Sequence, residues 1–118
     1  MRVIVTAIAS MMLTLTALAA SSDAAAPGDH AVVLTYHHID DTTPDSTSIT
    51  PAQFDAQLEF ISTQGFRVWP LSRITEALQQ GDAVPENVVG LSFDDAYASV
   101  FSHAHPRLQA RGWPYTVF

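Results

Sequence analysis

The sequence predicts an α/β fold, with either a parallel sheet or an α/β barrel, and three observations support this prediction. Short apolar runs rich in β-branched residues alternate along the chain with amphipathic segments of helical periodicity. The apolar runs are nearly continuous, as in strands that are buried on both faces. The order is strand–helix, strand–helix, strand–helix and strand, which is typical of parallel α/β proteins.

The first strand is expected at residues 31–36, and a polar loop around Pro44 follows it. The first helix has clear start signals, because Thr50 can cap it, Pro51 suits its first position and Gln53 completes a capping box. Its apolar face would consist of Phe54, Leu58 and Ile61, and Gly65 would end it.

A second strand is expected at residues 66–71, and a second helix from Ser72 to a stop at Gly81. The side chains expected to point inward from this helix are Ile74, Ala77 and Leu78. The third strand is expected at residues 88–93.

A helical stretch with a kink or a start at Pro106 should follow the third strand, and Gly112 should end it. Its inward side would carry Val100, Phe101, Ala104 and Leu108. The fourth strand-like run, residues 115–118, ends the sequence without a turn or a polar tail, so we expect the domain to continue beyond it.

Composition excludes several classes of function. The 118 residues carry a net charge of -7, with five Lys and Arg residues in all. Such a chain has no basic surface for nucleic acid or for an anionic membrane, whereas a neutral or cationic polymer would meet no repulsion. The absence of cysteine excludes disulfides, thiolate metal sites and cysteine nucleophiles.

The N-terminus indicates export. Arg2 precedes an uncharged apolar run at residues 3–20, and small-x-small patterns at residues 17–19 and 24–26 are candidate cleavage sites. Residues 1–26 therefore read as a signal peptide with the start of a linker, and an uncleaved signal anchor is the alternative. In either case residues 27–118 would lie outside the cytoplasm, in the periplasm, the cell envelope or the medium.

Two pairs of polar residues follow predicted strands, where ligands bind in parallel α/β folds. His37 and His38 follow the first strand, and Asp94 and Asp95 follow the third. Neighbouring carboxylates on an extended segment point in different directions, so one can bind a cation while the other accepts a proton from water. The alternative is an Asp pair that caps the next helix.

The segment Leu-Ser-Phe-Asp-Asp-Ala-Tyr at residues 91–97 resembles the first signature, [ST]-F-D-D-G, of polysaccharide deacetylases with a NodB-type domain, carbohydrate esterase family 4. Tyr-His-His-Ile at residues 36–39 resembles the branch that deacetylates poly-β-1,6-N-acetylglucosamine. The turn at residues 64–66 and the segment 112–118 also fit. The resemblance covers nearly all of the chain after the leader.

The resemblance implies a distorted α/β barrel, of which this chain would supply the first half. It implies a metal-dependent hydrolase that removes N-acetyl groups from an extracellular amino-sugar polymer, with poly-N-acetylglucosamine first and peptidoglycan or chitin-like polymers next. Asp94 would be the general base and Asp95 a ligand of a divalent metal, with zinc first and cobalt, manganese or nickel as alternatives. The active-site lining would include His37, His38 and Tyr97.

Two features depart from the family pattern. Ala96 stands where the family has glycine, which costs about 1 kcal/mol if the position needs a positive φ. The family's other metal ligands form an H-x3-H pair, and no such pair occurs in this sequence. His103 and His105 lie about 200° apart on a helix, so we expect surface histidines there rather than metal ligands.

Two further hypotheses stay open. The chain can be a catalytically inactive fragment, or it can be a sugar-binding module that keeps the fold without the chemistry. Trp69 and Trp113 can stack on sugar rings, but neighbouring prolines at strand ends favour packing for both.

Overall fold

The computed structural model describes residues 30–118, so the predicted leader lies outside the described residues. The main sheet has four strands: β1 (Val32–Tyr36), β4 (Arg67–Val68), β5 (Val88–Phe93) and β6 (Thr116–Val117). A second sheet has two short strands, β2 (His38–Ile39) and β3 (Ser48–Ile49). Every described strand pair is parallel, as the sequence predicts.

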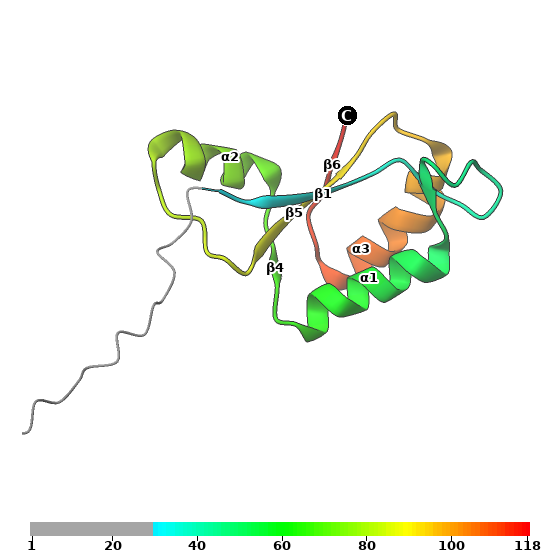
Figure 1. Ribbon diagram of the computed structural model, residues 1–118, viewed down its shortest axis with the longest axis horizontal. Helices are drawn as coiled ribbons and strands as arrows, with labels where there is room; N and C mark the ends of the chain where they lie inside the picture. The colour runs from blue at the N-terminus through cyan, green and yellow to red at the C-terminus, as the bar shows by residue number, and fades with distance from the viewer. Residues whose placement is uncertain (1–29) are drawn as a thin grey trace, which may run out of the picture.

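The helices alternate with the strands of the main sheet (Figure 1). They are α1 (Pro51–Thr63), α2 (Leu71–Gln80) and a π-helical turn η1 (Val100–Ala104) that continues into α3 (His105–Arg111). No helix among residues 30–118 is long and apolar enough to cross a bilayer.

Strand β5 lies at the centre of the sheet, and all of its residues are buried. It pairs with the whole of β1, from the register Val32↔Val89 to Tyr36↔Phe93. Along its other edge it pairs first with β4, at Val88 and Val89, and then with β6, at Ser92 and Phe93. The carboxyl ends of β1, β5 and β6 therefore lie at the same edge of the sheet.

The two faces of β5 meet different helices (Figure 1). Val89, Leu91 and Phe93 belong to the main core, which α1, η1 and α3 complete. Gly90 faces α2, because a Cβ atom at this position would lie 2.9 Å from Leu71 Cδ1. The sheet is thus a layer between α1 and α3 on one face and α2 on the other.

The start signals of α1 are confirmed. Thr50 Oγ1 accepts a hydrogen bond from the backbone N–H of Gln53, and Gln53 Oε1 accepts one from the N–H of Thr50, so the capping box is complete. The predicted inward residues Phe54, Leu58 and Ile61 are all buried.

Three details of the prediction are wrong. The second strand is limited to Arg67–Val68, because Pro70 offers no N–H for further pairing and α2 begins directly after it. Leu78 is 36% exposed, at the edge of the buried stripe of α2. Phe101 is 77% exposed and stacks on the ring of His105.

The different position of Phe101 follows from the π-helical turn. The N–H of His105 bonds to the carbonyl of Val100, five residues earlier, and the next residue, Pro106, has no N–H to donate. The widened turn changes which side chains face the core, so Val100 and Ala104 are buried while Phe101 points outward.

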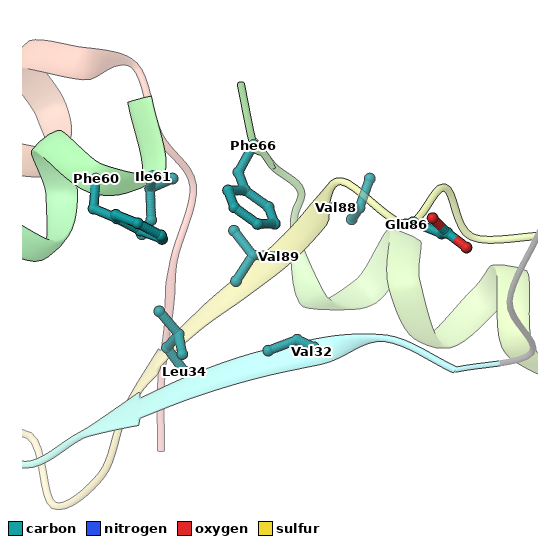
Figure 2. A pocket seen from close by; sticks show the side chains of 8 residues that line it. All are labelled: Val32, Leu34, Phe60, Ile61, Phe66, Glu86, Val88 and Val89. Atoms are coloured by element: carbon teal, nitrogen blue, oxygen red, sulfur yellow. The ribbon is translucent and has the colours of Figure 1, made fainter. Parts of the chain in front are cut away.

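An apolar hollow of about 200 Å³ lies at the amino end of the sheet, between β1 and the last turn of α1 (Figure 2). Its lining consists of Val32, Leu34, Phe60, Ile61, Phe66, Glu86, Val88 and Val89. Val32 and Phe60 are 55% and 59% exposed, so this part of the core is open to solvent.

Candidate active site

The pairing of β1 with β5 brings His37 and Asp94 together. The N–H of Asp94 donates to the carbonyl of Tyr36 at 2.8 Å, which fixes the first residue after β5 beside the last residue of β1. His37 Nε2 lies 3.8 Å from Asp94 Oδ2, too far for a hydrogen bond but close enough for a charge interaction. The side chains are 36% and 40% exposed, so water can reach both.

The two residues after Asp94 adopt left-handed backbone conformations. The φ angles are 67° at Asp95 and 47° at Ala96, so the position where the family has glycine does need a positive φ. At Ala96 this conformation costs about 1 kcal/mol relative to glycine, whereas aspartate adopts it at a lower cost. This turn directs the chain sharply away from β5 and leaves the backbone of Asp95 and Ala96 exposed.

His38 and Tyr97 form a stacked pair across the same edge of the sheet. Their ring centroids lie 3.5 Å apart with an interplanar angle of 26°. The nearby charge of Asp95 raises the pKa of Tyr97. We call residues 37–38 and 94–97 together the carboxyl edge, because they follow the carboxyl ends of β1 and β5.

A buried serine just before the π-helical turn η1 holds strand β2 in place. Ser99 is 8% exposed, and its Oγ accepts a hydrogen bond from the N–H of Ile39 at 3.1 Å. The N–H of His38 donates to the carbonyl of Thr47 in the loop before β3. These two hydrogen bonds fix the backbone of the strand that carries His38. No sequence pattern singles out Ser99, since a serine in a helical stretch is common.

Asp40 is a further acidic group near this edge that sequence reasoning missed. The side chain and the N–H of Thr42 both donate to its carboxylate, and these hydrogen bonds lower the pKa of Asp40. The charges of His103 and His38 act in the same direction with smaller effect. Asp40 thus stabilises the turn that leaves β2.

His105 is not the solvated residue that the sequence suggests. It is half-buried, and its Nδ1 lies 2.8 Å from the hydroxyl of Tyr115, which packs against Phe93 in the core. His105 therefore links the start of α3 to the segment before β6.

The two tryptophans lie in packed positions. The guanidinium of Arg73 lies 3.5 Å from the centre of the Trp69 ring, which also packs against a small core cluster around Ile74. Trp113 packs against the main core. These contacts favour the packing interpretation for both residues.

Residues 30–118 contain no group of three His, Cys, Asp or Glu side chains that could hold a metal ion. A catalytic zinc needs three protein ligands. The carboxyl edge offers Asp95 as one exposed carboxylate, so the described residues alone do not fit a complete metal site.

Comparison with known proteins gives a consistent picture. The sequence matches no protein-family model. Over 90 residues, 75% of this chain, it is 30% identical to the poly-β-1,6-N-acetyl-D-glucosamine N-deacetylase of Escherichia coli K12. The chain spans 13% of that protein's length.

Solved structures share the fold. The structure of IcaB from Ammonifex degensii has a TM-score of 0.67 and 31% identity, over 77% of this chain and 38% of IcaB. The deacetylase domain of BpsB from Bordetella bronchiseptica has a TM-score of 0.55 and 28% identity, over 74% of this chain and 36% of that domain.

The expected fold is thereby confirmed as a partial NodB-type α/β barrel. By sequence and by structure, this chain is similar to polysaccharide deacetylases, among them a poly-β-1,6-N-acetyl-D-glucosamine N-deacetylase, and it spans 38% of the IcaB structure and 36% of the BpsB structure.

Proposed function

We propose that this chain supplies the catalytic carboxylates for hydrolysis of N-acetyl groups on an amino-sugar polysaccharide, with poly-β-1,6-N-acetylglucosamine as the first candidate. The single observation that carries the proposal is the placement of His37 and Asp94 side by side at the carboxyl edge, with Asp95 in the strained turn that follows. The 30% identity to an E. coli poly-N-acetylglucosamine deacetylase supports the same polymer.

Asp94 has the geometry of a general base. Its carboxylate is 40% exposed and can accept a proton from a water molecule that attacks the acetyl carbon. His37, 3.8 Å away, holds the carboxylate in place when the imidazole is protonated. In the net reaction the C–N bond breaks, acetate leaves, and the nitrogen receives a proton to become an amine.

A divalent cation would polarise the acetamide carbonyl in such a reaction. Asp95 would supply one oxygen ligand, which suits zinc, cobalt, manganese or nickel. The other ligands would have to come from a segment other than residues 30–118, because these residues hold no three-ligand group. We therefore propose that this chain alone does not turn over substrate.

The lack of a three-ligand group among residues 30–118 favours a second candidate function, a saccharide-binding module without catalysis. Such a module would bind polymer in the absence of metal, and Asp94 would be dispensable to it.

For both candidate functions, the apolar N-terminal run, with Arg2 before it, supports export to the periplasm, the cell envelope or the medium.

A chimera tests the catalytic proposal. Residues 30–118 would replace the matching segment of the E. coli deacetylase, to which they align over 90 residues at 30% identity. Acetate release from poly-β-1,6-N-acetylglucosamine and the bound metal would both be measured. We expect Asp94→Asn to lower turnover by about 10²–10⁴-fold and to spare metal binding, whereas Asp95→Asn should reduce both.

Asp41→Asn is the matched control, because Asp41 is an exposed acid near the same edge, outside the proposed machinery. It should leave both readouts unchanged. Full acetate release by the Asp94→Asn chimera, or by residues 1–118 alone with added metal, would contradict the proposal.

A further inference from the structure

A polar hollow of about 300 Å³ lies beside the carboxyl edge, between the end of β1 and the loop that joins β2 to β3. Its lining consists of Thr35, Tyr36, His37, His38, Asp45, Ser46, Thr47, Ser48 and Ile49. This volume is at the lower end of the range for small-molecule sites. The lining residues are chiefly hydroxyl, imidazole and carboxylate side chains, which are groups that recognise sugars through hydrogen bonds.

The charge of the hollow favours a cation. Asp45 is exposed, and its carboxylate forms no hydrogen bond or ion pair with any residue between 30 and 118. No lysine or arginine is among the lining residues. The net charge of -7 adds a field of the same sign. A ligand that carries an ammonium group would form a charge-assisted hydrogen bond with this exposed carboxylate.

The hollow is continuous with the catalytic residues. His37 lines it and also lies 3.8 Å from Asp94, so the two sites share a side chain. His38 lines it as well and stacks on Tyr97 at 3.5 Å. A polymer with one unit at Asp94 would therefore place a neighbouring unit in the hollow.

We propose that this hollow is a saccharide subsite that takes a glucosamine unit with a free ammonium group, next to the unit that undergoes deacetylation. The proposal rests on the proposed function for the choice of an amino-sugar polymer. The glucosamine unit is itself the product of that reaction. The subsite would therefore favour action beside a unit that has already been deacetylated, and Asp45 would be a specificity-determining residue that takes no part in the chemistry.

Binding without metal tests this subsite separately from catalysis. The 118-residue chain would be titrated in EDTA at pH 7, where ordinary amines are protonated, with two β-1,6-linked trisaccharides. One trimer is fully N-acetylated, and the other has free amines. Chemical-shift changes in ¹H–¹⁵N spectra give the dissociation constants. We expect the amine trimer to bind at least about tenfold more tightly to the wild-type chain.

Asp45→Asn should abolish this preference, whereas Asp41→Asn, which removes the same charge from an exposed residue of the same loop outside the hollow, should retain it. Equal affinity for the two trimers, no binding of either, or a preference that survives Asp45→Asn would overturn the proposal. Each of these results would leave the chimera's acetate release, and thus the proposed function, to be judged on its own. If the chimera released no acetate while the 118-residue chain kept its preference for the amine trimer, the catalytic role alone would be contradicted.

Discussion

The two ends of the parallel sheet differ in chemistry, although the same strands form both. At the amino end, β1 and β5 present valine and leucine side chains to an open apolar hollow (Figure 2). At the carboxyl edge the same strands are followed by His37 and Asp94, and two residues with positive φ come after Asp94. The core next to the carboxyl edge is nevertheless the better packed of the two, because Phe93 is fully buried between aromatic rings.

The tighter packing lies next to the turn with positive φ angles that follows β5. A close-packed aromatic cluster of Tyr36, Phe54, Phe93 and Tyr115 lies directly beneath the carboxyl edge. Such a cluster can hold a strained turn in place, since strain persists only where the surrounding structure enforces it. Among the described residues, the amino end of the sheet has no non-glycine residue with a positive φ, and its core contains the open apolar hollow.

The largest predicted effect is a loss of stability at the carboxyl end of β5, measured against a substitution at its amino end on the same face. Phe93→Ala should lower the free energy of unfolding by about 3–5 kcal/mol, because it leaves a cavity in the aromatic cluster. Val89→Ala should cost only about 2 kcal/mol, since Val89 already borders the apolar hollow. Urea denaturation of both variants measures the difference, and equal losses would show that the two ends are packed alike.

The second prediction concerns Tyr36, the last residue of β1, whose burial raises its pKa to about 12 from the ordinary 10.0. A raised folded-state pKa gives stability that is complete below pH 10 and is lost as the pH rises toward 12. The free energy of unfolding should fall by roughly 2–3 kcal/mol over that interval.

The control for this prediction is Tyr36→Phe, which keeps the ring but removes the hydroxyl and its 2.7 Å hydrogen bond to Gln57. Denaturation curves of the variant should lack this alkaline decrease. A parallel decrease in the wild type and the variant would assign it to other groups.

The smallest predicted effect concerns the strained turn. Ala96→Gly should stabilise the fold by about 0.5–1 kcal/mol, because glycine adopts the φ of 47° without strain. The same substitution at Ala56, exposed in the middle of α1, should destabilise by about 1 kcal/mol. Thermal denaturation gives both signs, and destabilisation at both positions would show that Ala96 is not strained.

The sequence was most informative where local signals and burial agree. The capping box of Thr50 and Gln53 predicted the start of α1 correctly. The β-branched runs predicted β1 and β5. The rule that ligands bind beyond the carboxyl ends of parallel strands singled out His37 and Asp94, and the structure places the two side by side.

Features that depend on tertiary contacts were not predictable. The pairing of β2 with β3 depends on a loop, and the buried hydrogen bond of Ser99 joins residues far apart in the chain. The outward position of Phe101 depends on the π-helical turn before Pro106, which helical periodicity cannot reveal. The carboxylate of Asp45, which has no partner among residues 30–118, becomes informative only once the hollow around it is known.

If the carboxyl edge acts as one catalytic unit, the residues that follow β1 and β5 should be coupled in catalysis. A double-mutant cycle on acetate release by the chimera, with His37→Gln, Asp94→Asn and both together, measures this coupling. We predict that His37→Gln alone lowers kcat by about 10–100-fold and that the double variant is no slower than Asp94→Asn alone, because residues that act as a unit are non-additive. Losses that multiply, or a His37→Gln variant with unchanged kcat, would contradict it.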